Sequence, residues 1–297
     1  MGSCGCGGRT AGEPDARAAV RRLSRDVQAI ADVLARYVEE AALDDRAERV
    51  ARAVAHAARL ARIVGGARVP TGGFPECALV GDDDEFFCSG TLIHPRAVLS
   101  AAHCVAGGPR PTRVRLACDT DVSVGTEEEV RVVKARVHPR YRPDGANDLS
   151  LLVLERPART APARRVSTKE LVAATSVHLV GFGYDDPEAA LGFGTKRQVN
   201  VPIGAMRRKP AETLAALADR LEFDPATEFV AGRKALGRDS CNGDSGGPAY
   251  VRVGARWKLA GVTSRATADA VRPCGDGGVY GRVDAHAPWI DHVLASL

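Results

Sequence analysis

The sequence GDSGGP at residues 243–248 is the most informative part of this 297-residue chain. A serine hydroxyl is a weak nucleophile until a base takes its proton, and the oxyanion that its attack creates needs preorganised N–H donors. Glycine at position 243 lets the backbone turn so that two N–H groups converge on one oxygen. The stretch therefore predicts Ser245 as a nucleophile, with the N–H groups of Gly243 and Ser245 as its oxyanion hole.

Two stretches upstream supply the partners that such a serine needs. The sequence LSAAHC at residues 99–104 contains His103, a candidate base whose loop we expect Cys88 and Cys104 to clamp. In NDLSLL at residues 147–152, Asp148 leads into a buried strand, where a carboxylate is costly unless it is hydrogen-bonded, and the Nδ1–H of a histidine is a suitable donor. A single histidine or aspartate of this kind is ordinarily structural. Together with Ser245 they predict a nucleophile, a base and an orienting carboxylate.

After Ile63 the chain consists mainly of short runs rich in Val and Leu, separated by clusters of Gly, Pro and Asp, which is typical of an all-β barrel or sandwich. We also expect short helices over 212–221 and 288–297. The runs that we interpret as strands are 97–100, 113–117, 130–137, 149–154, 177–180 and 258–262.

The N-terminal part has a different pattern. Apolar residues recur in steps of three and four over 15–42, and an Ala- and Arg-rich stretch follows at 47–61 behind the candidate N-caps Asp44 and Asp45, so both segments are predicted to be helices. We therefore expect residues 1–62 to be a Gly- and Cys-containing tail with a helical hairpin, serving as a pro-segment or an interaction module. Residues 63–297 form the second domain.

Composition excludes several classes of function. A hydrophobic content of 45% with 26% charged residues is ordinary for a soluble globular protein. The formal charge of +4 includes no long basic block and aromatic residues make up only 5%, so we expect no nucleic-acid partner. Since no run of about 18 apolar residues occurs, we expect no membrane span. Nothing indicates a cofactor or a metal ion.

The cysteines and the N-terminus give conflicting indications of the compartment. The sequence MGSCGCGG has no apolar core of the kind that a secretory signal needs. We interpret Cys4 and Cys6 as idle thiols, with lipidation or metal binding as alternatives. Eight cysteines, six of them after residue 62, are nevertheless typical of a disulfide-bearing extracellular protein; the six are Cys77, Cys88, Cys104, Cys118, Cys241 and Cys274.

Four stretches in the same order resemble the chymotrypsin/trypsin family of serine proteases: IVGG at 63–66, AAHC at 101–104, DLSL at 148–151 and GDSGGP at 243–248. The resemblance extends from Ile63 to the C-terminus. It implies two packed six-stranded antiparallel β-barrels with a C-terminal helix, a boundary between the barrels near 155–175, and endopeptidase activity through an acyl-enzyme.

The resemblance also implies a preference for basic side chains. Asp239 matches the carboxylate at the bottom of the S1 pocket, which stays uncompensated unless a substrate Arg or Lys brings the opposite charge. Ser264 bounds this pocket, Gly278 leaves its far wall open, and Cys241 with Cys274 ties the walls together. The substrates expected are therefore proteins or peptides with Arg or Lys at the cleaved position.

Two features depart from the family pattern or extend it. Relatives usually carry Ser-Trp-Gly where residues 264–266 read SRA, so Arg265 replaces an aromatic platform and Ala266 adds a methyl group at the pocket entrance. The loop 267–273 is long, which we expect to narrow access to the S1 pocket.

We also propose a disulfide between Cys77 and Cys118, because both should lie on strands of the first barrel. The acidic stretch 119–129 is interpreted as a solvated loop rather than a calcium site.

The junction Arg62-Ile63 resembles a zymogen activation site. In the family, cleavage there frees an ammonium group that pairs with the carboxylate beside the nucleophile, which is Asp244 in this chain. An unpaired buried Asp244 would cost roughly 3–5 kcal/mol, enough to keep the uncut chain mostly inactive. An activating protease is therefore an expected partner. The alternative is that Arg62 merely ends a helix.

Two other functions remain open at this point. The chain could be a protease homologue that binds partners without cutting them, although Ser245, His103 and Asp148 are all present. Alternatively, residues 15–62 could recruit an active protease to a cytoplasmic assembly, which the lack of a signal sequence would favour.

Overall fold

The computed structural model describes residues 66–118, 127–143, 145–184, 193–206, 210–272 and 274–297. The helices predicted over 15–42 and 47–61, the tail cysteines and the Arg62-Ile63 junction lie outside the described residues.

Six antiparallel strands close the first barrel. In spatial order they are β2 (Cys77–Gly81), β3 (Phe86–His94), β4 (Ala97–Ser100), β7 (Ser150–Leu154), β6 (Glu128–Val137) and β5 (Arg113–Leu116). Strands β2, β4 and β7 are buried along their whole length, since one face fills the barrel and the other is covered by the rest of the fold. This double burial explains why their sequences are continuous apolar runs rather than alternating ones.

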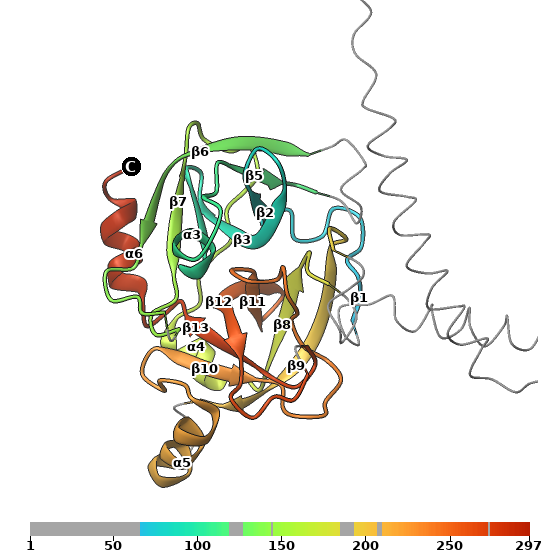
Figure 1. The fold of residues 1–297 in the computed structure, drawn as a ribbon, viewed down its shortest axis with the longest axis vertical. Helices are drawn as coiled ribbons and strands as arrows, with labels where there is room; N and C mark the ends of the chain where they lie inside the picture. Colours follow the sequence, from blue (N-terminus) through green and yellow to red (C-terminus); the bar gives the residue numbers. More distant parts are fainter. Residues whose placement is uncertain (1–65, 119–126, 144, 185–192, 207–209, 273) are drawn as a thin grey trace, which may run out of the picture. The chain divides into compact units, whose positions relative to one another are not determined.

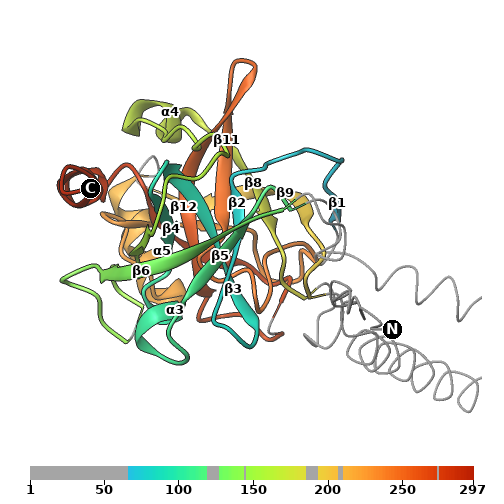
Figure 2. The same ribbon diagram turned by 90° about the horizontal axis from the view of Figure 1, so that it is seen from above.

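A second closed barrel follows in the chain, after a connection over 155–175. Its spatial order is β8 (Ser176–Gly181), β9 (Arg197–Ala205), β10 (Glu228–Ala231), β13 (Gly278–Arg282), β12 (Arg256–Ala266) and β11 (Pro248–Val253), and β11 pairs with β8 to close it. The two-residue strand β1 (Ala67–Arg68) adds a seventh strand beside β9. Figure 1 shows this barrel below the first one, and Figure 2 shows the same pair from above.

Four short helices lie among the described residues: α3 (His103–Ala106), α4 (Thr168–Ala173), α5 (Ala211–Leu221) and α6 (Ala287–Leu294). Helix α5 matches the helix expected over 212–221, and α6 covers most of the one expected over 288–297. Helix α6 packs Ile290 and Val293 into the core of the first barrel, so the chain returns to that barrel at its C-terminus. Helix α4 was not predicted, although Ser167 and Glu170 form a reciprocal capping box at its start.

The predicted fold class is confirmed, but several strands were missed. The sequences of β3 (FFCSGTLIH), β9 (RQVNVPIGA) and β13 (GVYGR) interrupt their apolar residues with Gly, Pro or charged groups, so their periodicity is weak. Tertiary pairing with neighbouring strands, not local pattern, makes them extended. No described helix is long and apolar enough to cross a membrane.

Two of the three expected disulfides are present: Cys88–Cys104 and Cys241–Cys274. The third prediction was wrong, because Cys77 and Cys118 are buried free thiols. Their sulfur atoms face different backbone carbonyls, that of Val180 at 3.8 Å from Cys77 Sγ and that of Arg115 at 3.6 Å from Cys118 Sγ. Cys77 lies on β2, whereas Cys118 follows the end of β5 at Leu116, so the two cysteines do not face each other across paired strands as the prediction assumed.

Candidate active site

The candidate base lies at the start of α3, directly after β4. The disulfide between Cys88 and Cys104 fastens this helix to β3, so the segment carrying His103 is anchored on both sides. The imidazole is 34% exposed, which leaves one edge of the ring open to a substrate. Anchoring of the backbone with partial exposure of the ring is the arrangement that proton transfer requires.

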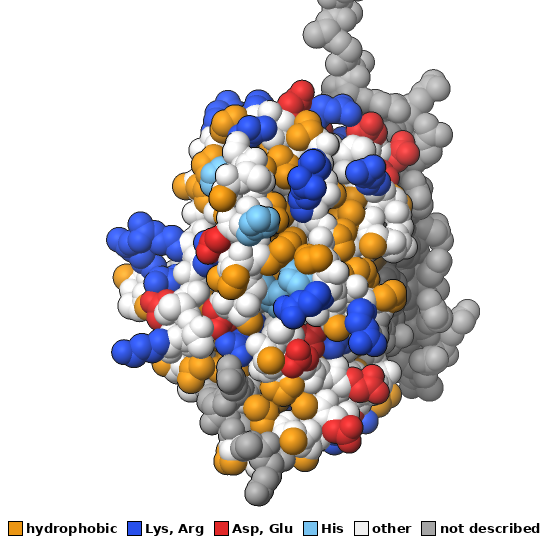
Figure 3. Space-filling model, turned by 90° about the vertical axis from the view of Figure 1, so that its left-hand side faces the viewer, with side chains coloured by type: hydrophobic (Ala, Val, Ile, Leu, Met, Phe, Trp, Pro, Cys, Tyr) orange, Lys and Arg blue, Asp and Glu red, His pale blue; other side chains and the backbone are white. Residues whose placement is uncertain are grey.

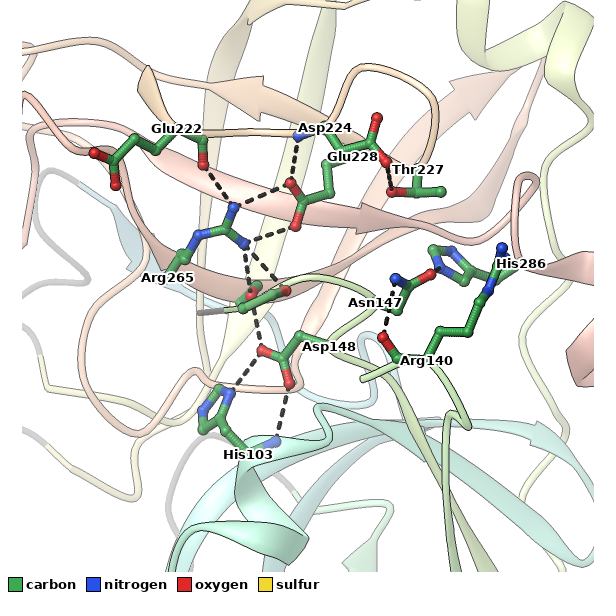
Figure 4. Close-up of polar contacts among 12 residues, drawn as sticks. His103, Arg140, Asn147, Asp148, Glu222, Asp224, Thr227, Glu228, Arg265 and His286 are labelled. Atoms are coloured by element: carbon green, nitrogen blue, oxygen red, sulfur yellow. Dashed lines mark hydrogen bonds and ion pairs between the residues drawn. The ribbon is translucent and has the colours of Figure 1, made fainter. Parts of the chain in front are cut away.

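Asp148 holds the histidine by two hydrogen bonds. Its Oδ2 accepts from His103 Nδ1 at 2.7 Å, and its Oδ1 accepts from the backbone N–H of His103 at 2.9 Å. The hydroxyl of Ser264 donates a third bond to Oδ2 at 2.7 Å (Figure 4). Burial raises the pKa of Asp148, but these hydrogen bonds outweigh it and the net pKa lies below the usual value. The carboxylate is therefore ionised, and Nε2 is the imidazole nitrogen left for a reaction.

The turn that carries Ser245 is pressed against the first barrel. The carbonyl oxygen of Ser245 accepts from the N–H of Ser89 at 2.8 Å and lies 3.6 Å from Cys104 Sγ, next to His103 in the chain. Gly243 has φ +89°, and a Cβ there would lie 2.6 Å from Cε2 of Phe193. Only glycine fits this conformation and space, so the sequence requirement that we read at position 243 has a physical basis in the fold.

Asp244 lies behind the same turn and is buried. Its carboxylate accepts hydrogen bonds from the N–H groups of Gly183 and Cys241, both at 2.8 Å. Burial raises the pKa of Asp244 to about 6, although these bonds and the charge of Arg197 act in the opposite direction. The ionised carboxylate is therefore only partly compensated by its described neighbours, and a nearby cation would stabilise it.

A cavity with Asp239 in its lining opens beside Ser245. The carboxylate of Asp239 accepts from the Tyr280 hydroxyl at 2.7 Å and from the N–H of Ser240 at 2.8 Å. Burial raises the pKa of Asp239 to about 7 in spite of these bonds. The cavity is lined by Asp239, Ser240, Cys241, Asn242, Ser245, Thr263, Ser264, Arg265, Ala266, Arg272, Gly275, Asp276, Gly277 and Gly278. A carboxylate that is costly to ionise when the cavity is empty is suited to a cationic ligand.

The two departures from the family pattern lie at the rim of this cavity. Arg265 occupies the position where relatives carry the aromatic platform, but its guanidinium is directed to Glu228, with which it pairs at 2.7 Å. In the long loop, Arg272 pairs with Asp276 at 2.8 Å, and both line the cavity. Neither ion pair was predicted from the sequence, and neither was the hydrogen bond from Tyr280 to Asp239, because the choice of partner depends on the folded chain.

The site contains one apparent cluster of metal ligands, formed by Cys88, His103 and Cys104, whose potential ligand atoms lie within 4.8 Å of one another. Both sulfur atoms belong to the disulfide, so neither is a thiolate that could bind a metal ion. In the acidic stretch expected to be a solvated loop, residues 119–126 lie outside the described part. The end of the stretch is not a solvated loop, because Glu128 lies on β6, is buried and pairs with Arg156 at 2.7 Å.

Figure 3 shows the face that carries α6, on which basic, acidic and apolar side chains of the described residues are interleaved. Charge on this face is therefore not gathered into one block.

Two comparisons with known proteins agree with this geometry. The family model described as Trypsin matches residues 63–290. A curated protein named Trypsin, from Saccharopolyspora erythraea, is 34% identical over 220 residues, which cover 70% of this chain and 87% of that protein.

Proposed function

Because this chain belongs to the trypsin family and is a serine endopeptidase, we propose that it cleaves peptide bonds on the carboxyl side of Arg and Lys. The observation that carries this proposal is the buried carboxylate of Asp239 in the cavity beside Ser245. A guanidinium or ammonium group entering the cavity would compensate its charge, whereas an apolar side chain would leave the carboxylate unpaired.

The proposed reaction uses three residues in distinct roles. Ser245 Oγ attacks the scissile carbonyl carbon while His103 Nε2 takes the hydroxyl proton, and the imidazolium that forms is stabilised by Asp148 through Nδ1–H. The N–H groups of Gly243 and Ser245 hold the developing oxyanion. His103 then gives its proton to the leaving amine, which leaves an acyl-enzyme on Ser245. Water activated by the same imidazole hydrolyses this ester.

The experiment that tests the specificity is replacement of Asp239 by Ser. The wild-type protein is expected to cut a peptide library after Arg and Lys, and Asp239→Ser is expected to lose this preference because the cavity loses the charge proposed to bind the base. Total proteolysis can fall as well, so the measured quantity is the ratio of kcat/KM for Arg to that for Leu at the cleaved position. An unchanged ratio would contradict the role of Asp239.

Activation by cleavage after Arg62 forms the second part of the proposal. The new ammonium group on Ile63 would pair with Asp244, whose carboxylate lacks a full counter-charge among the described residues. The strand register places the start of the described chain near Asp244. Arg68 on β1 is the backbone partner of Arg197 on β9, and Arg197 is in turn the backbone partner of Gly181 on β8. Gly181 lies so close to Asp244 that a Cβ there would overlap the carboxylate.

The distances make this pairing attainable. Two strand spacings of about 4.8 Å separate Arg68 from Gly181, which is roughly 10 Å across the sheet. The six residues from Ile63 to Arg68 are joined by five Cα–Cα steps, which span at most about 17 Å when extended. A freed Ile63 therefore has enough chain to reach Asp244. Residues 1–62 would then act as the pro-segment that cleavage removes from the new terminus.

A further inference from the structure

Arg265 lines the cavity beside Ser245, and hydrogen bonds to several neighbours hold its guanidinium. It follows Ser264 on β12, and its Nη1 and Nη2 groups donate to the two carboxylate oxygens of Glu228 at 2.7 and 3.0 Å. Nη2 also donates to the carbonyl oxygen of Glu222 at 2.7 Å. Figure 4 shows the guanidinium between Glu228 and the Asp148–His103 pair.

The ion pair is enclosed rather than lying on the surface. The side chain of Glu228 is 2% exposed and that of Arg265 is 27% exposed, and Glu228 also accepts from the N–H of Asp224 at 2.8 Å. A buried ion pair contributes little net stability, because desolvation offsets most of the attraction. Stability is therefore a weak explanation for this pair, and its contacts toward the reacting groups point to a second role.

The first such contact fixes the proton of Ser264. Arg265 Nη1 lies 3.4 Å from Ser264 Oγ, and a guanidinium can only donate hydrogen bonds. One lone pair of the hydroxyl oxygen is thus occupied, so the hydroxyl proton is directed to another acceptor. Asp148 Oδ2 lies at 2.7 Å and takes it. Arg265 therefore orients the hydrogen bond that Ser264 donates to Oδ2 of Asp148, the same oxygen that accepts from His103 Nδ1.

The second contact restrains the turn that leads to Asp148. Arg265 Nη1 donates to the carbonyl oxygen of Gly145 at 3.3 Å, and a Cβ at Gly145 would lie 2.7 Å from the same nitrogen. Asn147, directly before Asp148, has φ +52°, which is a strained conformation that its surroundings must maintain. Arg265 thus links the substrate-binding strand of the second barrel to the segment that carries Asp148.

We propose that Arg265, held in place by Glu228, is a positioning residue that fixes the carboxylate of Asp148 toward His103. The proposal rests on the catalytic roles proposed above. Arg265 acts through Ser264 and the turn at Gly145, and it touches no substrate in this role. An arginine therefore takes the place of the aromatic platform expected from the family pattern, and its guanidinium supports the base instead of a substrate.

The test compares Arg265→Met with the double variant Arg265→Met/Glu228→Gln. The single variant leaves Glu228 buried without a counter-charge and can fail to fold, whereas the double variant is neutral and keeps an oxygen for the N–H of Asp224. Folded sites are counted by calorimetric titration with benzamidine, which needs the S1 pocket but not the triad. Every variant is first cut after Arg62, and turnover of a small Arg amide is then expressed per benzamidine site.

In the double variant kcat per site is expected to fall by roughly 10-fold or more, because a small displacement of a catalytic group is costly. The KM of the amide and the affinity for benzamidine should stay within about twofold. Arg265→Lys restores a donor without the planar fork and should recover part of the loss. The matched control is Arg220→Gln, which removes an exposed ion pair with Asp269 from helix α5 and should leave kcat unchanged.

Wild-type kcat per site in the double variant would overturn the proposal and leave the ion pair as a structural feature only. A loss confined to KM would also overturn it, since that result would assign Arg265 to substrate binding. Ser245→Ala separates this outcome from failure of the proposed function: if that variant is inactive, the serine mechanism stands whatever Arg265 does.

Discussion

Binding of benzamidine should weaken steeply at acidic pH, and the magnitude follows from Asp239. Its pKa is raised to about 7 by burial in the empty cavity. Only the ionised carboxylate pairs with the amidinium, so the apparent Kd is the intrinsic Kd divided by the ionised fraction. That fraction is about 90% at pH 8 and about 1% at pH 5, so the apparent Kd should rise roughly 90-fold, or about 2.7 kcal/mol.

The direction follows from the proton balance. Binding of the cation expels the proton from Asp239, so affinity is full above the raised pKa and is lost as the pH falls through it. An aspartate with an ordinary pKa near 3.9 would change its ionised fraction by less than about 10% over the same range. The experiment therefore reports the environment of this carboxylate and not merely its presence.

The assay is calorimetric titration of the purified protein with benzamidine between pH 5 and pH 8. It is performed in the His103→Ala variant as well, so that protonation of the imidazole cannot contribute. Asp239→Asn is the matched control, since it keeps the size and shape of the side chain and should bind weakly at every pH. A Kd that stays constant down to pH 5 in the His103→Ala variant would refute the reasoning from burial.

The remaining predictions concern the reaction and its activation. Ser245→Ala or His103→Ala should lower turnover of an Arg ester or amide by about three or more powers of ten with circular dichroism unchanged; near-wild-type turnover in either variant would refute the assigned roles. The full-length chain should be nearly inactive toward small Arg substrates until it is cut after Arg62, and Asp244→Asn should stay poorly active after cutting, because an amide gives the freed Ile63 ammonium no charge to pair with. If Arg62→Gln, shown by mass spectrometry to be uncut, were as active as the chain beginning at Ile63, activation by cleavage would be wrong and residues 1–62 would be better explained as a recruitment module.

Local sequence was sufficient for the elements with strong patterns. Strand β4 and the core of β7 are continuous apolar runs, and helix α5 has a clear amphipathic period, so all three were predicted nearly to their bounds. The pairing of Cys88 with Cys104 was also expected correctly. Strand β13 escaped prediction because its five residues include two glycines and an arginine, and its extended shape comes from pairing with β10 and β12.

The sequence by itself determined the family, because four short motifs carry the resemblance, and the resemblance implied the two-barrel fold and the groups proposed to react. The tertiary structure alone decided how those groups are supported. Arg265 pairs with Glu228, which is 37 positions away in the sequence, and Ser264 donates a hydrogen bond to Asp148, which is 116 positions away. Likewise, Cys77 and Cys118 remain free although they belong to one barrel. Which side chains meet depends on how strands far apart in the chain pair in space, and that pairing has no local signature in the sequence.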